Sequence, residues 1–137
     1  MKSTDSKRLL RLEIENRVLT YLLMINEIST DVKNALINMG IKSVCVYGMN
    51  NAGQFLLKFF EKNGIECFGV DRKAKNLNFG YKIYSDIDAW PTAQLFIVAG
   101  EMYFDEIENI IRNRCSASVA KASEFLEELL SVPIKYC

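Results

Sequence analysis

The first forty residues carry the apolar pattern of two helices. An apolar stripe at helical spacing predicts a long amphipathic helix over residues 4–26. Its regularly spaced members are Leu9, Leu12, Leu19 and Leu23, and Val18, Leu22 and Ile25 widen the stripe. A shorter helix is expected over 31–39, because Ser29 or Thr30 can cap its start and Gly40 can close its end.

Beyond Gly40, apolar runs of strand length alternate with segments of helical periodicity. Strands are expected over 41–47, 65–70, 81–84, 95–99 and 116–121. Helices are expected over 54–63, 85–90, 102–113 and 123–130. This alternation predicts an α/β fold, a Rossmann-like parallel sheet flanked by helices and preceded by the N-terminal amphipathic helix.

The chain length and the absence of linkers indicate a single domain over residues 1–137. No stretch rich in Pro, Gly or Ser interrupts the 137 residues, of which 50% are hydrophobic and 25% charged. We expect an N-terminal helical segment over 1–39 and a Rossmann-like core over 40–137.

Charge and hydropathy remove several classes of partner. Lys and Arg total 17, as do Asp and Glu, so the formal net charge is zero and nothing favours binding to nucleic acid or an anionic membrane. The apolar run at 18–25 is too short for a bilayer span, and the charged start lacks the features of a secretory signal. We therefore expect a cytoplasmic protein without a membrane span.

Histidine is absent from the chain, which excludes acid–base chemistry by histidine, Ser-His or Cys-His nucleophile pairs and most zinc sites. The four cysteines form no CxxC pair, and Cys45 and Cys67 fall inside apolar runs, where a thiol packs as a small hydrophobe. No metal site and no catalytic residue are predicted.

The turn after the first predicted strand carries the most specific signal. Residues 48–53 read GMNNAG, which is the GxGxxG dinucleotide fingerprint with Asn50 in place of the middle glycine. In this fingerprint Gly48 permits the tight exit from the strand and Gly53 permits close packing of helix on strand. Asn tolerates left-handed backbone angles, although its side chain intrudes where a pyrophosphate would lie.

Asp71 stands at the end of the second predicted strand. Its distance along the chain from Gly53 is close to the separation of about 20 residues at which an acid after the fingerprint reaches a ribose hydroxyl. Arg72 and Lys73 suit an additional phosphate, and Gly100 follows the strand over 95–99 at the edge where ligands of parallel sheets bind. We interpret these residues as a nucleotide site with phosphate at the helix N-terminus, held by amides after Asn50. The alternative is that the glycines only shape a tight turn and Asp71 begins a solvated loop.

These segments resemble the small Rossmann domains of bacterial polysaccharide and sugar-modification proteins. The resemblance rests on GIKSVCVYGMNNAG, FFEKNGIECFGVD and YKIYS, at 40–53, 59–71 and 81–85. Its relatives include the nucleotide-sugar-binding domain of sugar acetyltransferases and the NAD-binding domain of nucleotide-sugar dehydratases and epimerases. The resemblance implies that NAD(H) or a nucleotide-sugar binds. The residues it implies as contacts are Gly48, Asn50, Asn51, Gly53 and Asp71.

Three functions remain open at this point. None of the tyrosines has a lysine four residues on, so the YxxxK chemistry of those dehydratases and epimerases is absent. We favour a nucleotide-binding module of sugar or polysaccharide biosynthesis without complete catalytic machinery over a sugar-nucleotide oxidoreductase or epimerase. For the latter, Glu101, Tyr103 and Asp105 are the nearest polar cluster.

The third hypothesis is an assembly protein that forms a homodimer through its N-terminal helix. Leu9, Leu12, Asn16, Leu19 and Leu23 follow the a and d spacing of a coiled coil. Only two heptads are present, so packing of this stripe on the domain's own sheet is an equal alternative.

Overall fold

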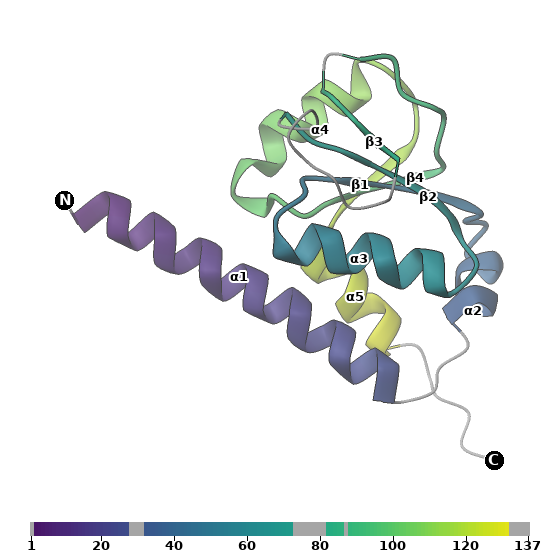
Figure 1. The fold of residues 1–137 in the computed structure, drawn as a ribbon, viewed down its shortest axis with the longest axis horizontal. Coiled ribbons are helices and arrows are strands. Elements are labelled where there is room, and N and C mark those ends of the chain that lie inside the picture. Colours follow the sequence, from purple (N-terminus) through teal and green to yellow (C-terminus); the bar gives the residue numbers. More distant parts are fainter. Residues whose placement is uncertain (1, 28–31, 73–81, 87, 132–137) are drawn as a thin grey trace.

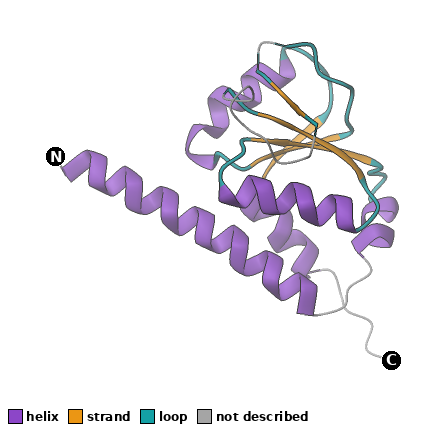
Figure 2. Ribbon diagram, viewed as in Figure 1, coloured by secondary structure: helices purple, strands orange, loops and turns teal. Residues whose placement is uncertain are grey.

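The chain forms a five-stranded sheet between layers of helices (Figures 1 and 2). The structure is a computed structural model and describes residues 2–27, 32–72, 82–86 and 88–131. The helices are α1 (Lys2–Glu27), α2 (Val32–Asn38), α3 (Asn51–Lys62), the short 3-10 helix η2 (Glu101–Tyr103), α4 (Phe104–Arg112) and α5 (Ala122–Ser131). The strands are β1 (Ser43–Tyr47), β2 (Glu66–Val70), β3 (Ile83–Tyr84), β4 (Leu95–Val98) and β5 (Ser118–Lys121).

All strand pairs are parallel, in the order β3-β2-β1-β4-β5. The chain therefore builds outward from β1 in one direction through β2 and β3, then crosses back to β4 on the other side of β1. The point where the direction reverses lies between β1 and β4. This confirms the predicted parallel α/β sheet with helices on both faces.

The two faces of the sheet carry separate apolar clusters. Val44, Val46 and Ile97 point toward α3 and α5, and α1 packs mainly against those two helices rather than on the sheet. Cys45 and Phe96 point to the opposite face, which α4 and the segment around Trp90 cover. Figure 1 shows the resulting layers, with α4 on one side of the sheet and α3, α5 and then α1 on the other.

Helix α1 occupies the predicted segment, but its apolar residues lie on two faces. Val18, Leu22 and Ile25 are buried against the rest of the molecule. Leu9 and Leu23, members of the stripe predicted from spacing, are 61% and 66% exposed. The members that widen the predicted stripe therefore pack on the core, whereas Leu9, Leu12 and Leu23 do not. The helix forms as predicted, but the prediction of a single buried apolar stripe is wrong.

The helix expected over 85–90 is the other wrong prediction. Its described residues form a turn and an extended segment, because the Asp88 amide donates to the Ser85 carbonyl and the Asp88 carboxylate accepts from the Ser85 amide. Trp90 Nε1 also donates to the Ser85 carbonyl at 3.0 Å, and Pro91 follows. The side-chain hydrogen bonds of Asp88 and Trp90 compete with those of a helix. In addition, Pro91 disfavours helical backbone angles at the residue before it, Trp90.

The remaining predictions differ from the structure only at their ends. Helix α3 begins three positions earlier than expected, at Asn51, and the segment over 102–113 divides into η2 and α4. Helices α2 and α3 end before Gly40 and Gly64, as predicted. Ser29, Thr30, Asp31, Lys73 and Tyr81, which entered the sequence predictions, lie outside the described residues. Within the described ranges, no helix has both the length and the apolar character needed to cross a membrane.

Candidate functional site

The turn between β1 and α3 needs glycine at both ends. Gly48 has a φ of 102°, a backbone conformation that side chains disfavour, and a Cβ there would stand 3.2 Å from the Gly100 amide nitrogen. A Cβ on Gly53 would stand 1.9 Å from the Gly48 carbonyl oxygen. Gly53 therefore lets the first turn of α3 lie directly against the end of β1, which is the role the fingerprint predicts.

Asn50 is the N-cap of α3. Its Oδ1 accepts the Gly53 amide at 2.8 Å, and its Nδ2 donates to the Ala99 carbonyl at 3.4 Å. Its φ of −66° and ψ of −178° are extended, so the tolerance of Asn for left-handed angles plays no part. The residue holds its place by capping, because its side chain satisfies an amide that the helix leaves open.

Asp71 lies beside this turn, immediately after β2. Its Oδ2 accepts the Met49 amide at 2.7 Å, and its own amide donates to the Tyr84 carbonyl at 3.0 Å. The bond to Met49 joins the turn after β1 to the end of β2. The structure thus brings together the two features that the sequence predicted as one site.

A cleft of about 380 Å³ opens at the carboxyl ends of β1 and β2. It lies beside the point where the strand order reverses, and η2 and α4 form its other wall. Its lining residues are Tyr47, Gly48, Asp71, Arg72, Tyr103, Glu106 and Ile107. Tyr47 is the last residue of β1. The sequence singled out Gly48, Asp71, Arg72 and Tyr103 but missed Glu106 and Ile107, which α4 brings in and which no local pattern marks.

The hydroxyl of Tyr47 is buried and has no hydrogen-bond partner among the described residues. Burial, together with the Asp86 carboxylate, raises the pKa of this hydroxyl, while Arg72 and Arg114 act in the opposite direction. An unsatisfied buried hydroxyl costs about 1–3 kcal/mol. Tyr47 thus lines the cleft, while its ring packs against Trp90 and its hydroxyl is enclosed.

Asn50 and Gly100 line a smaller space of about 40 Å³ next to this cleft. Helix α1 closes it, contributing Arg11 and Glu15. Arg11 therefore lines the same small space as Asn50, and so do the acids Glu15 and Glu101. The sequence analysis missed Arg11, because its approach to the turn depends on how α1 crosses the domain.

Among the other predicted polar residues, Arg72 and Glu101 contact other protein side chains, and Asn51 and Asp105 are exposed. Arg72 is 71% exposed and its Nε lies 3.5 Å from the Asp86 carboxylate. The Glu101 carboxylate accepts the Ser123 hydroxyl at 2.6 Å and the Ser123 amide at 3.0 Å, which satisfies an amide in the first turn of α5. Asn51 is exposed as the first residue of α3, and Asp105 is exposed on α4.

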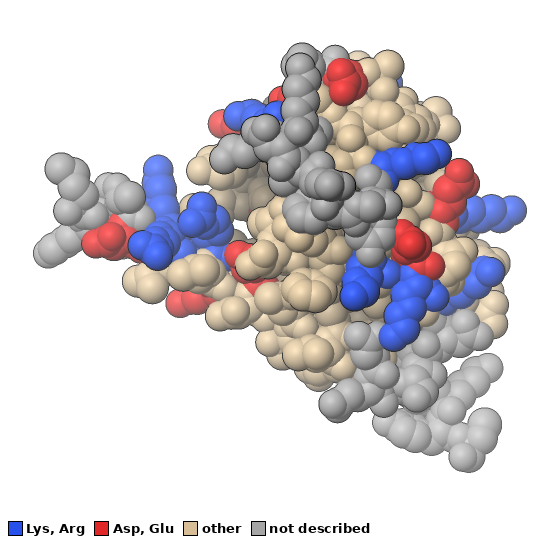
Figure 3. Space-filling view, viewed as in Figure 1, with Lys and Arg blue, Asp and Glu red and all other residues tan. Residues whose placement is uncertain are grey.

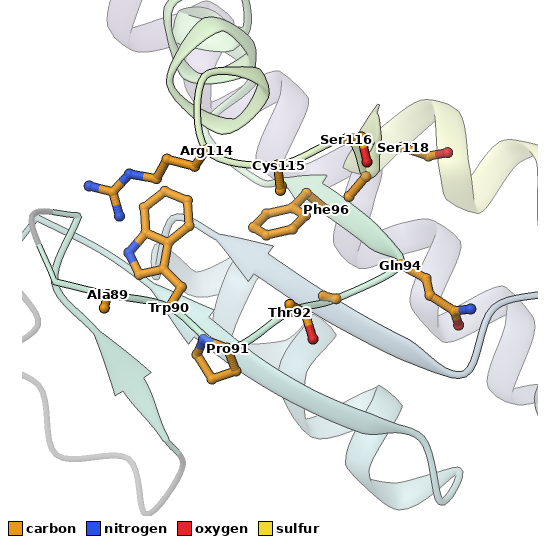
Figure 4. Close-up of a pocket in the computed structure, with 12 residues that line it drawn as sticks. Ala89, Trp90, Pro91, Thr92, Gln94, Phe96, Arg114, Cys115, Ser116 and Ser118 are labelled. Carbon is orange, nitrogen blue, oxygen red and sulfur yellow. The ribbon is translucent and has the colours of Figure 1, made fainter.

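A second cleft of about 630 Å³ lies toward the amino ends of β4 and β5 (Figure 4). The Arg114 guanidinium lies 3.9 Å from the centre of the Trp90 ring and donates to the carbonyls of Asp86 and Asp88. These contacts satisfy the Arg114 and Trp90 polar groups within the protein and anchor the segment before β4. The cleft near Asp71 is therefore the stronger candidate site.

Acidic and basic side chains are interspersed over the visible face of the molecule (Figure 3), in keeping with its net charge of zero. No group of His, Cys, Asp or Glu in the described residues could hold a metal ion. Comparison with protein-family models, curated proteins and solved structures finds no match, so the resemblance to sugar-modification proteins stays a prediction.

Proposed function

We propose that this chain is a nucleotide-binding module that takes NAD(H) or a nucleotide-sugar in the cleft beside Asp71. The observation that carries the proposal is that Gly48 and Asp71, from the ends of neighbouring strands, line one cleft of about 380 Å³. That volume lies within the range of about 300–1,000 Å³ for small-molecule sites. Ligands of parallel sheets bind at such strand ends, beside the reversal in strand order.

The strand order adds independent support. The order β3-β2-β1-β4-β5 is that of the first five strands in the dinucleotide-binding Rossmann sheet. In that fold the acid at the end of the second strand accepts ribose hydroxyls, and the pyrophosphate lies at the N-terminus of the first helix. We assign these roles to Asp71 and to the turn that leads into α3.

The cleft also suits the nucleoside end of such a ligand. Tyr103 is 58% exposed and offers an aromatic face on which a base can stack. We propose binding rather than catalysis because Asp71 and Arg72 contact neighbouring protein groups that position them.

The phosphate end of the ligand has to meet Asn50. Because Asn50 Oδ1 accepts the Gly53 amide, a pyrophosphate at the helix N-terminus competes with it for that donor. Arg11, which lines the same small space as Asn50, would attract the phosphate, whereas Glu15 and Glu101 in that space would repel it. On binding, a phosphate oxygen would thus replace Asn50 Oδ1 as the acceptor of the Gly53 amide.

The test is to follow the thermal stability of the protein during titration with NAD, NADH, UDP-sugars and dTDP-sugars. A ligand at 100 times its dissociation constant stabilises the folded state by about 2.7 kcal/mol. We expect stabilisation by one of these nucleotides and at least about a tenfold loss of affinity in Asp71→Ala. Asp105→Ala, an exposed acid outside the cleft, is the matched control and should bind normally.

Each variant is compared with its own unliganded form, since Asp71→Ala also loses the bond to the Met49 amide. Absence of stabilisation by every nucleotide would contradict the proposal. An Asp71→Ala affinity equal to that of wild type would remove Asp71 from the site. The role in sugar or polysaccharide biosynthesis that the resemblance implies rests on which nucleotide binds.

A further inference from the structure

Helix α1 presents a second apolar face that the other described residues leave largely uncovered. We call this face the outer stripe. Its members are Leu9, Leu12, Asn16, Leu19 and Leu23. Leu9 and Leu23 are 61% and 66% exposed and Leu12 is 43% exposed, whereas Leu19 is half-buried. Leucines exposed in a row at regular spacing are typical of an interaction surface rather than of scattered surface residues.

The other described elements pack against a different side of α1 from the outer stripe. Val18, Leu22 and Ile25 are buried against the helical layer beneath. At 100° per residue, the centre of this buried set lies about 130° around the helix from the centre of the outer stripe. Figure 1 shows α1 along the outside of the molecule, with its N-terminal end extending beyond the other elements.

We propose that the outer stripe pairs with the outer stripe of a second copy of this chain in a parallel coiled coil. The stripe follows heptad spacing, with Leu9, Asn16 and Leu23 at a positions and Leu12 and Leu19 at d positions. A single Asn at an a position pairs best with the same Asn of an identical, parallel and in-register helix. Asn16 therefore favours a second copy over an unrelated apolar helix.

The charges that flank the outer stripe fit the same arrangement. In this register Arg8 occupies a g position and Glu13 the following e position. Parallel coiled coils bring each g residue beside the next e residue of the partner helix. Two symmetric Arg8–Glu13 pairs would thus form across the dimer, whereas an antiparallel pairing would separate these residues.

The apolar surface continues from the outer stripe onto α3. Leu19 and Leu23 line one side of a groove of about 410 Å³, and Phe55, which is 53% exposed, lines the other. The groove therefore adds apolar area beside the C-terminal half of the stripe. This matters because two heptads alone give a weak coiled coil.

Sedimentation of the full chain over a concentration series up to about 100 µM tests the proposal. Wild type should be dimeric, and Leu9→Asp with Leu12→Asp should lower the association constant by at least about tenfold. Leu10→Asp is the matched control, since Leu10 is 48% exposed on the same turn but lies outside the stripe. Circular dichroism and melting of each variant report whether its monomer remains folded.

A charge exchange tests the parallel arrangement without disturbing the apolar residues. Arg8→Glu or Glu13→Arg alone should weaken the dimer by about threefold or more, and the double exchange should restore it. A monomeric wild type would overturn the proposal and leave the stripe for a different protein. Equal disruption by Leu10→Asp would also overturn it, and failure of the double exchange to recover would overturn the parallel pairing.

Discussion

Gly53 shows how one missing side chain fixes the geometry of the turn. We expect Gly53→Ala to lower the free energy of unfolding by about 1–3 kcal/mol or more, because its Cβ would meet the Gly48 carbonyl at 1.9 Å. Gly100→Ala is the control, since the nearest atom to its Cβ would be Ile107 Cδ1 at 3.7 Å, an ordinary contact. Urea denaturation measures both. Equal free energies of unfolding for the two variants would show that the backbone of the turn can shift to accommodate the Gly53→Ala side chain without loss of stability.

Cys67 gives a second prediction at the scale of the residue. Burial, with Glu61 and Glu66 nearby, raises its pKa from the usual 9.0 to about 11. The folded state therefore favours the protonated thiol, and the resulting stabilisation is fully present below pH 9.0 and is lost as the pH rises toward about 11. Cys67→Ala should show a shallower decline in the free energy of unfolding across that interval. Parallel declines in the two proteins would contradict the shift.

The role of Asn50 could be predicted from the sequence only in part. The spacing of Gly48 and Gly53 indicated a tight turn with a substituted middle position, and the structure confirms that turn. Capping by Asn50 was missed, because the helix was expected to begin at Gln54 and a cap is recognised only once the first helical residue is known. The contact of Met49 with Asp71 depends on strand order, which spacing does not encode.

At the scale of the element, three substitutions of Asn50 separate its capping of α3 from ligand binding. Asn50→Asp keeps an acceptor for the Gly53 amide and should leave stability close to that of wild type. Its negative charge should weaken nucleotide binding. Asn50→Gly should cost a few tenths of a kcal/mol in stability, restore the fingerprint and tighten binding, while Asn50→Ala should cost about 0.5–2 kcal/mol.

Chemical denaturation and nucleotide titration of the same three proteins provide the comparison. A nucleotide affinity in Asn50→Asp equal to that of Asn50→Gly would mean that no phosphate approaches this end of α3. The proposed exchange of acceptors at the start of the helix would then be wrong.

Elements whose pattern is local were predicted well, and those that depend on side-chain hydrogen bonds were not. Strands β1, β2 and β4 are short apolar runs bounded by turn residues, which indicate a strand without reference to the rest of the fold. The described residues of the segment over 85–90 form no helix because Asp88 and Trp90 both bond to Ser85. The second apolar face of α1 was hidden because spacing alone does not show which face meets the domain.

At the scale of the whole molecule, the two proposed surfaces are separate. The outer stripe and the Asp71 cleft share no lining residue, so nucleotide binding and dimer formation should be independently removable. We expect Leu9→Asp with Leu12→Asp to bind nucleotide with an affinity close to that of wild type. We expect Asp71→Ala to remain dimeric by sedimentation. Loss of both properties in either variant would show that the two surfaces are coupled.

The most direct measurement of the central claim is the change in backbone amide NMR signals as NAD(H) or a nucleotide-sugar is added. The proposal predicts that the largest changes fall on the turn from Gly48 to Gly53 and on Asp71 and Arg72, at the ends of β1 and β2. Changes confined to the cleft around Trp90 and Arg114, or no changes with any nucleotide, would contradict it.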